Sequence, residues 1–278
     1  MSGSAADVTP VILTRDEEAN IGRTLAQLAW AREVIVVDSM SSDATPSIAR
    51  TFANVRFLQR AFDDLASQWT FAVAQASTDW VLTLDADYVV PDAFIDELKG
   101  LSGAPAPSPV RAGEAPAPHR IAAYIAHFDY AVRGRKLRGS LYTPRAVLLR
   151  RDAVTFTMDG HTQRVNINGA TSTLRTRFVH DDRKPFKRFV ERQRVYMRDE
   201  AEKIRRGENL NFAARVRKLR VVAPFAVLLQ TLFVKGLILD GVPGLIYTFE
   251  RVVAELMLSR ELFRTGGRPR PPARREPR

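Results

Sequence analysis

The chain has 278 residues, of which 45% are hydrophobic, and its formal net charge is +11. This length suits one domain with an extension. The sequence contains no cysteine, which excludes disulfides, thiolate metal sites and cysteine nucleophiles. Any metal must therefore be bound by oxygen or imidazole ligands.

The charge is distributed unevenly along the chain. Residues 1–100 carry 7 Lys and Arg against 15 Asp and Glu, whereas residues 101–278 carry 35 against 16. A basic half suits an anionic partner, either nucleic acid or acidic lipid headgroups, and a basic surface that is merely solvated is the alternative. The first residues show no basic stretch followed by an apolar run, so we expect no secretory signal and a cytoplasmic acidic half.

Four short apolar runs predict buried strands, because each is bounded by polar or turn residues. The runs are 11–13, 34–37, 55–58 and 80–84, and helical spacing between them predicts helices near 17–29, 44–53 and 63–76. Thr45 and Pro46 offer a cap and a first-turn proline for the second helix. The alternation predicts a parallel, doubly wound sheet with its ligand beyond the carboxyl ends of the strands.

The chain beyond residue 100 predicts a flexible loop, further strands and a basic helix. Residues 102–118 are rich in proline and alanine and predict a surface loop. Strand-like segments follow at 120–130, 146–150 and 173–179, which indicates a mixed sheet. Residues 185–206 have the apolar period of an amphipathic helix with a basic outer face.

Two apolar stretches, 221–239 and 245–262, lie near the C-terminus. A proline, a glutamine and a lysine interrupt the first, so a single membrane span is disfavoured. We predict two interfacial helices or a re-entrant pair, and basic flanking residues favour anionic lipid. A soluble helical hairpin is the alternative. The tail, 266–278, is rich in proline and arginine and is predicted to be disordered.

Polar clusters follow three of the predicted strands. Asp85 and Asp87 come directly after the strand at 80–84, and two carboxylates suit Mg²⁺ or Mn²⁺ bridging a diphosphate. Alone this pattern is weak, because acidic residues are common in turns. Residues 14–18 and 38–45 follow two other strands, and parallel strands bring all three clusters to one edge, where they can contact a nucleotide. For Asp43 the alternative is a cap on the next helix.

These three segments, in this order, resemble glycosyltransferase family 2, and within it the lipopolysaccharide core glucosyltransferases that have a membrane-associated C-terminal region. Residues 138–145 and 239–244 support the resemblance, which covers roughly residues 8–262. It implies an α/β fold, the nucleotide-diphospho-sugar transferase fold called GT-A, in which helices flank a Rossmann-like mixed sheet. It also implies inversion at the sugar carbon, a divalent metal, and UDP-glucose or a similar UDP-hexose as donor.

The resemblance also implies roles for single residues. Thr14, Glu17 and Asp38 become nucleoside contacts, with Asp38 placed to accept from a uracil N–H, and Ser41 becomes a further nucleotide contact. The family usually has asparagine where Asp16 stands, so neighbouring contacts differ.

Asp85 and Asp87 become ligands of the ribose and of the metal-bound diphosphate, and His180 becomes the imidazole that completes the metal site. The alternative for His180 is a cap or loop histidine. The family often has glutamate where Tyr88 stands. Since a leaving diphosphate needs positive charge, Arg145 or Arg183 is expected to supply some of it.

Direct displacement at the anomeric carbon needs a general base near the acceptor hydroxyl. Relatives often carry glutamate at the position of Gln163, whose amide cannot take up a proton. Asp159 and His161 are the nearest titratable substitutes, with Asp159 preferred, and Gln163 is expected to hold a sugar hydroxyl. The alternative is that Asp159 and Gly160 only form a tight turn.

We therefore predict a glycosyltransferase domain over residues 1–205 and a membrane-associated helical region over 206–265. The partners would be a nucleotide-diphospho-sugar, anionic lipid and a lipid-linked or lipopolysaccharide-precursor acceptor, at the cytoplasmic face of the inner membrane, with peripheral or monotopic attachment.

Two other classes fit part of the sequence. A sugar-nucleotide nucleotidyltransferase would share the sheet, but it needs a glycine-rich, lysine-bearing loop where residues 14–18 are acidic. A basic nucleic-acid-binding protein with a degenerate enzyme domain would bind polynucleotide with strong salt dependence. We predict no nucleic-acid partner.

Overall fold

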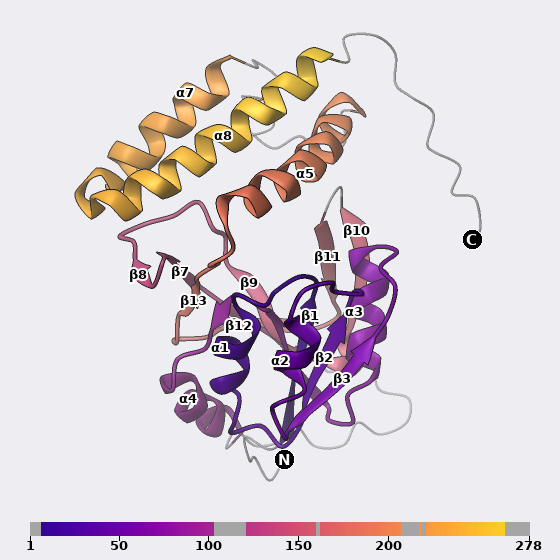
Figure 1. Cartoon of the computed structure of the whole chain (residues 1–278). Coiled ribbons are helices and arrows are strands. Elements are labelled where there is room, and N and C mark those ends of the chain that lie inside the picture. The colour runs from indigo at the N-terminus through magenta and orange to yellow at the C-terminus, as the bar shows by residue number, and fades with distance from the viewer. Residues whose placement is uncertain (1–6, 103–120, 160–161, 207–216, 218–220, 265–278) are drawn as a thin grey trace. The chain divides into compact units, whose positions relative to one another are not determined.

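The computed structural model describes residues 7–102, 121–159, 162–206, 217 and 221–264 (Figure 1). Contacts divide the chain into two compact units, Met1–Lys184 and Pro185–Arg278. Helix α5 (Phe186–Arg206), which the sequence analysis includes in the transferase domain, belongs to the second unit. The predicted flexible loop, apart from its first residue, and the predicted disordered tail lie outside the described residues.

The first unit is built on a seven-stranded mixed sheet with the order β12-β6-β9-β4-β1-β2-β3. One half is parallel and consists of β1 (Val8–Thr14), β2 (Val34–Asp38), β3 (Val55–Gln59) and β4 (Trp80–Asp85). These strands coincide with the four apolar runs, so the predicted parallel arrangement of this half is confirmed. Neighbouring residues of one strand pack into different hydrophobic cores. Ile12 belongs to one core and Val11 to the other. Burial on both faces explains why these strands are apolar throughout.

Three helices connect the parallel strands: α1 (Ile21–Ala26), α2 (Thr45–Ala49) and α3 (Leu65–Ala74). Pro46 lies in the first turn of α2, and Asp64 caps α3 by accepting from the Ser67 backbone N–H at 2.9 Å. The helices are shorter than predicted. The loop before α1 is hydrogen-bonded to Ser41 and to Thr45, the first residue of α2. Because the backbone N–H groups of Asp16 and Glu17 are used in these bonds, α1 begins later in the sequence than predicted.

The other half of the sheet contains β6 (Ile121–Ala126), β9 (Arg145–Arg150) and β12 (Ala170–Thr173). Strand β9 runs antiparallel to both β4 and β6, which makes the sheet mixed, as predicted. The predicted continuous strand over 173–179 is wrong. The Arg175 and Thr176 backbone N–H groups donate to the Glu97 carboxylate at 2.7 and 2.8 Å, so side-chain bonds replace a strand ladder there.

Two smaller sheets complete the first unit. A four-stranded sheet has the order β5-β13-β7-β8. Its strands are β5 (Tyr88–Val89), β7 (Phe128–Val132), β8 (Arg135–Lys136) and β13 (Phe178–His180). The hairpin β10 (Val154–Asp159) and β11 (Thr162–Ile167) packs on α3, where Phe156 stacks on Trp69 with ring centroids 6.2 Å apart. Helix α4 (Ala93–Ser102) and the 3-10 turn η2 (Arg151–Ala153) are the remaining elements.

The second unit is helical in its described part. It contains α5, α7 (Val222–Leu229), the π-helical turn η3 (Gln230–Val234), the 3-10 turn η4 (Leu237–Asp240) and α8 (Val242–Arg264). Helices α5 and α8 share an apolar seam formed by Ala201, Ile204, Leu258 and Leu262. None of the helices in the described residues has the length and apolar composition that a bilayer crossing requires.

Gly244 permits the close approach of α8 to η4, and its substitution tests this packing. A Cβ at this position would clash with the Leu237 carbonyl oxygen. We expect Gly244→Ala to lower the free energy of unfolding by about 1–3 kcal/mol, the range for overpacking. Thermal unfolding followed by circular dichroism measures the change.

The matched control is Gly100→Ala in α4, where a Cβ would meet no atom within 4 Å. Since alanine favours helix over glycine, this variant should be about 0.5–1 kcal/mol more stable than the wild type. If Gly244→Ala unfolds like the wild type, the close approach of α8 to η4 is incorrect.

Candidate functional site

The carboxyl ends of three parallel strands lie side by side at one edge of the large sheet. Strand β1 lies between β2 and β4, and its register pairs Thr14 with Asp38 on one side and Leu13 with Asp85 on the other. Two strand spacings of about 4.8 Å therefore separate the backbones that carry the two aspartates. The polar clusters after the strands meet at the edge where α/β proteins bind ligands.

Asp38 holds the turn that follows β2. Its side chain is completely buried and accepts from the Thr14 hydroxyl at 3.0 Å, the Ser41 backbone N–H at 2.9 Å and the Gln59 amide at 3.3 Å. The Ser41 hydroxyl donates to it as well, at 2.5 Å. A buried carboxylate is stable only when it is satisfied in this way. The expected contacts of Thr14, Asp38 and Ser41 with a nucleotide stay predictions.

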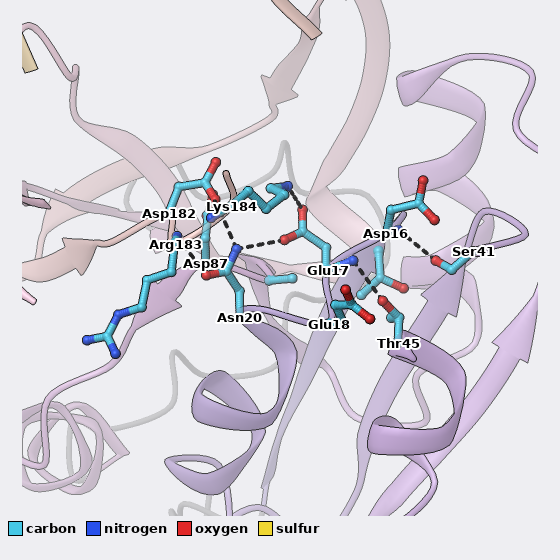
Figure 2. A network of polar contacts seen from close by, with 12 residues as sticks. Asp16, Glu17, Glu18, Asn20, Ser41, Thr45, Asp87, Asp182, Arg183 and Lys184 are labelled. Carbon is cyan, nitrogen blue, oxygen red and sulfur yellow. Dashed lines mark hydrogen bonds and ion pairs between the residues drawn. The ribbon is translucent and has the colours of Figure 1, made fainter. Parts of the chain in front are cut away.

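The loops after β1 and β2 are joined by hydrogen bonds from successive backbone N–H groups (Figure 2). The Asp16 N–H donates to the Ser41 hydroxyl at 2.8 Å, and the Glu17 N–H donates to the Thr45 hydroxyl at 2.7 Å. The Glu18 N–H donates to the Asp43 carboxylate at 3.1 Å. Side chains of the second loop thus satisfy the backbone where the β1 ladder ends.

Asp16 lies in the left-handed region of backbone conformation, with φ of 52°. Asparagine and aspartate tolerate this region better than most residues, because their short side chains bond locally. The Asp16 carboxylate accepts from the Ser42 backbone N–H at 2.9 Å. Aspartate in place of the family's usual asparagine therefore permits the same left-handed backbone and provides a side-chain oxygen that accepts the Ser42 N–H.

Asp87 and His180 are brought together although 92 residues separate them. Strand β13 pairs antiparallel with β5, which sets His180 opposite Tyr88, and the Asp181 backbone N–H donates to the Asp87 carbonyl at 3.1 Å. The Asp87 Oδ2 atom lies 3.5 Å from His180 Nε2, and these side chains are only 8% and 11% exposed. Asp85, the last residue of β4, is half-buried. Two of the three predicted metal ligands are thus neighbours.

Among the described residues, no three His, Asp or Glu side chains form a group with metal-binding geometry. The pair of Asp87 and His180 supplies one carboxylate and one imidazole. Phosphate oxygens of a ligand usually complete the shell of Mg²⁺ or Mn²⁺ at such sites.

Aromatic rings surround the His180 imidazole. It stacks on Tyr130 with centroids 4.7 Å apart and is tilted against Tyr142 at 4.6 Å. The Tyr88 and Tyr142 hydroxyl oxygens are 2.5 Å apart, so the tyrosine that stands where relatives often have glutamate bonds to a second tyrosine. Burial, and then the charge of Asp85, raises the pKa of both hydroxyls.

Arg145 is the cation of this cluster. It is the first residue of β9, and its guanidinium lies 5.0 Å from the centre of the Tyr142 ring. Burial disfavours its charge, but Tyr88, Tyr142, Asp85 and Asp87 favour it, and the net effect raises its pKa. Arg145 therefore keeps a permanent positive charge within electrostatic reach of both aspartates.

The second predicted cation, Arg183, is held by Asp181. The Asp181 carboxylate accepts from Arg183 Nε at 2.9 Å and from the Gly134 backbone N–H at 3.1 Å, and it lies 3.5 Å from Arg23 Nη1. Asp181 is 4% exposed, whereas the Arg183 side chain is 45% exposed. The geometry favours Arg145 over Arg183 as the cation beside Asp85 and Asp87.

Lys184 and Asn20 are site residues that the sequence analysis missed. Lys184 Nζ bonds Glu17 Oε1, and the Asn20 amide donates to Glu17 at 2.9 Å and to Asp182 at 3.0 Å (Figure 2). The lysine and glutamate side chains are only 10% and 13% exposed. The two basic residues soon after His180 were the available signal, but Glu17, the partner of Lys184, is 167 residues away in the sequence.

Burial raises the pKa of Glu17 to about 7, although Lys184 and the Asn20 amide act in the opposite direction. The charge of Glu17, and with it the ion pair between Glu17 and Lys184, therefore depends strongly on pH. The expected contact of Glu17 with a nucleoside stays a prediction.

The residues proposed for proton transfer lie on the β10–β11 hairpin. Asp159 pairs with Thr162 at its end, and Gln163 pairs with Met158. Gly160 and His161 lie outside the described residues. The hairpin is a two-stranded sheet separate from the one that carries His180. The roles of Asp159, His161 and Gln163 stay predictions.

Comparison with known proteins finds a family likeness for part of the chain. Residues 10–104 match the family model of glycosyl transferase family 2. The lipopolysaccharide core biosynthesis glycosyltransferase LpsC of Rhizobium meliloti is 30% identical over 97 residues, which cover 34% of this chain and 36% of that protein. The uncharacterized glycosyltransferase RT0209 of Rickettsia typhi is 33% identical over 93 residues, covering 33% and 32%.

The predicted resemblance to glycosyltransferase family 2 is thus confirmed for this part of the chain. The chain spans about a third of the length of the curated relatives it matches.

A solved structure extends the likeness to the fold of most of the chain. Mannosyltransferase PcManGT from Pyrobaculum calidifontis, in complex with GDP-Man and Mn²⁺, aligns with a TM-score of 0.52 at 14% identity. The alignment covers 94% of this chain and 88% of that one. At this identity the likeness concerns the fold alone, and together with the mixed sheet it confirms the predicted GT-A type of α/β fold.

Glu17 makes the stability of the protein depend on pH in a defined direction. Between its ordinary pKa of 4.5 and its folded pKa of about 7, the folded protein binds more protons than the unfolded one. The free energy of unfolding contributed by this group therefore falls as pH rises through this window, by at most about 3 kcal/mol. Denaturant titrations at pH 4.5, 6 and 7.5 on the wild type and Glu17→Gln measure the difference.

Because glutamine does not titrate, the Glu17→Gln variant should lack this part of the pH dependence. The control is Glu18→Gln, which removes an exposed carboxylate from the same loop and should leave the wild-type slope unchanged. Parallel pH profiles for the wild type and Glu17→Gln would contradict the assignment.

Proposed function

We propose, from the family-2 match of residues 10–104 and the carboxylates at the sheet edge, that this chain is an inverting glycosyltransferase that uses a nucleotide-diphospho-sugar. The observation that carries the proposal is the meeting of Asp38, Asp85 and the Asp87–His180 pair beyond the carboxyl ends of neighbouring strands. Such an acidic edge, with the half-buried Arg145 beside it, suits a donor whose diphosphate arrives with a divalent cation.

The donor is proposed to be a UDP-hexose, with UDP-glucose first. This choice follows from the resemblance to lipopolysaccharide core glucosyltransferases, and the matching relative LpsC is a lipopolysaccharide core biosynthesis glycosyltransferase. The structurally similar mannosyltransferase is in complex with GDP-Man, so a nucleotide-diphospho-sugar is what the two donors have in common. Thr14, Glu17, Asp38 and Ser41 are the proposed nucleotide contacts.

The ligand atoms present fit Mn²⁺ or Mg²⁺, because Asp87 and His180 offer a carboxylate and an imidazole 3.5 Å apart and Asp85, the last residue of β4, stands two positions before Asp87. PcManGT is in complex with GDP-Man and Mn²⁺. A bound divalent ion would act as a Lewis acid toward the leaving diphosphate. Arg145 adds fixed positive charge within electrostatic reach of the same carboxylates, and its guanidinium lies over the Tyr142 ring.

Inversion requires a base on the acceptor side of the sugar. We propose Asp159 for this role and His161 as the alternative, with Gln163 holding a sugar hydroxyl. On the hairpin Asp159 pairs with Thr162 and Gln163 pairs with Met158, in neighbouring pairs of the ladder.

The first loop disfavours the sugar-nucleotide nucleotidyltransferase alternative. A triphosphate is bound by free backbone N–H groups of a glycine-rich loop. Here the N–H groups of Asp16, Glu17 and Glu18 already donate to Ser41, Thr45 and Asp43. The loop is therefore closed to phosphate and carries acidic side chains instead.

Apolar side chains that are exposed on α8 support membrane docking by the second unit. They recur at spacings of three, four and seven residues, so they share one face. They are Val242, Leu245, Phe249, Leu256 and Phe263, each more than half exposed. The buried side of α8 is mixed, with the apolar Tyr247, Leu258 and Leu262 beside the polar Thr248, Glu255 and Ser259. Because the exposed face of a helix in water is normally polar, this surface suits an apolar medium.

The segment before α8 continues this apolar surface. Phe225, Leu229, Phe233, Val234 and Leu239 are between 56% and 78% exposed. With these residues in the interface and basic side chains at the headgroups, the chain is proposed to lie on the cytoplasmic face of the inner membrane, where a lipid-linked or lipopolysaccharide-precursor acceptor resides. A nucleic-acid-binding protein would not expose such a surface, because nucleic-acid interfaces are polar and positively charged.

Asp87→Asn tests the transferase proposal. The variant keeps the shape of the side chain and loses its charge, so it should reduce metal-dependent hydrolysis or transfer of a UDP-sugar on the order of 100-fold, the size of effect seen when one transition-state charge contact is removed. The assay uses purified full chain with a panel of UDP-sugars, with and without Mn²⁺.

The control is Asp79→Asn, an exposed aspartate beside the opposite end of the same strand, β4. It should retain wild-type turnover. Full activity of Asp87→Asn would refute the metal assignment.

Flotation with vesicles tests the docking proposal. We expect the wild type to float with vesicles that contain phosphatidylglycerol, and Phe233→Glu combined with Leu239→Glu to reduce the bound fraction at least about tenfold, because two apolar side chains no longer enter the interface. Phe62→Glu, at an exposed phenylalanine of the first unit, is the control and should float like the wild type. Equal flotation of the double variant would exclude this surface as the anchor.

A further inference from the structure

Helices α7 and α8 leave an apolar groove between them within the second unit. Its volume is about 720 Å³, inside the range of about 300–1,000 Å³ that is usual for small-molecule sites. The side chains along it are Val221, Phe225, Leu228, Val252, Leu256 and Phe263. Three of them, Phe225, Leu256 and Phe263, are 64%, 54% and 54% exposed. A ligand that covers them gains about 25 cal/mol for each Å² of apolar surface removed from water.

Two arginines line the same groove. Arg260 and Arg264 lie four residues apart on α8, so they project from the same face of the helix, and both belong to the groove lining. Arg264 pairs with Glu261 at 3.1 Å on the surface, with 59% of its own side chain exposed, and such an exposed pair is easily exchanged for a stronger partner. Two guanidinium groups one turn apart suit the oxygens of one phosphate.

The apolar groove and its two arginines together indicate which ligand fits. A bare phosphate would contact only the arginines, and a neutral lipid would contact only the apolar side chains of the groove. Residues 266–278 of this chain contain no leucine, isoleucine, valine or aromatic residue, so they do not complement the apolar lining. A helix-dipole role for basic residues at the end of α8 accounts for the arginines but leaves the exposed Phe225 and Leu256 unexplained.

We propose that this groove binds a single anionic lipid, with a hydrocarbon chain along Phe225 and Leu256 and its phosphate on Arg260 and Arg264. The inference deepens the proposed membrane docking and rests on it. It assigns the second unit a specific lipid site in addition to a general apolar surface, and it identifies the lipid as one with a phosphate headgroup.

The test uses a soluble short-chain lipid, which separates binding at the groove from binding to a membrane surface. Dihexanoyl phosphatidic acid, kept below its micelle concentration, is titrated into the full chain by calorimetry, beside dihexanoyl phosphatidylcholine and glycerol 3-phosphate. We expect saturable binding of the phosphatidic acid and at least about tenfold weaker binding of the other two. Glycerol 3-phosphate lacks the hydrocarbon chains, and the phosphodiester of phosphatidylcholine carries one negative charge that its own choline ammonium offsets, whereas phosphatidic acid presents a phosphomonoester.

Arg260→Ala with Arg264→Ala should weaken the binding of phosphatidic acid at least about tenfold. The matched control is Arg194→Ala with Arg198→Ala, two exposed arginines with the same spacing on α5, which should leave affinity unchanged. Leu256→Ser keeps both arginines and should also weaken binding, because it shortens the apolar wall. Far-ultraviolet circular dichroism confirms that each variant is folded.

Several results would overturn the lipid site. The first is equal binding of phosphatidylcholine. The second is unchanged affinity for phosphatidic acid in the variant Arg260→Ala with Arg264→Ala, or an equal loss of affinity in the α5 control. The third is a concentration-dependent dimer that phosphatidic acid does not dissociate, because a second copy of the chain would then occupy the groove. If the wild type floats with vesicles and hydrolyses donor yet does not bind the short-chain lipid, this inference fails alone. If it binds the lipid but does not hydrolyse donor, the transferase proposal fails alone.

Discussion

Parallel pairing of β1 with β2 on one side and β4 on the other is the constraint on which the first unit depends. It sets the backbones of Thr14, Asp38 and Asp85 at one level of the sheet, so polar residues that are far apart in the sequence share an edge. The buried Asp38 carboxylate then ties the turn after β2 to β1 through Thr14 and Ser41. Without that satisfaction a buried charge would be costly, and the turn would not hold.

A second set of contacts adds chemistry to this edge. The short sheet that contains β5 and β13 places His180 beside Asp87, and tyrosine rings enclose the imidazole. The same sheet directs the following segment, Asp181 to Lys184, back to α1, where Lys184 meets Glu17. Each acidic group of this region therefore has a cation nearby. Arg145 stands beside the two aspartates of the β4 end, and Lys184 stands beside the acid of the first loop.

The second unit follows a different physical rule. Its helices pack through a seam of small and aliphatic residues between α5 and α8, and Arg217 joins Glu255 and Glu200 beside that seam. The opposite face of α8 is apolar and exposed. An apolar face that is exposed over several turns is favourable when something other than water covers it, which is why this face and the groove direct attention to lipid.

From the sequence alone, the parallel half of the sheet and the cluster of candidate ligands were predictable, because short apolar runs bounded by polar residues report strands and because parallel strands end at one edge. The helices α5 and α8 were also visible from their apolar spacing. The break between β12 and β13 was not, since it depends on Glu97 satisfying the backbone of Arg175 and Thr176 from a distant helix. The pairing of Lys184 with Glu17 and the choice of Arg145 over Arg183 were decided by the tertiary structure. Lys184 meets Glu17 across 167 residues, and Arg145 acts on two aspartates about 60 residues before it in the sequence. No local pattern of a sequence contains that information.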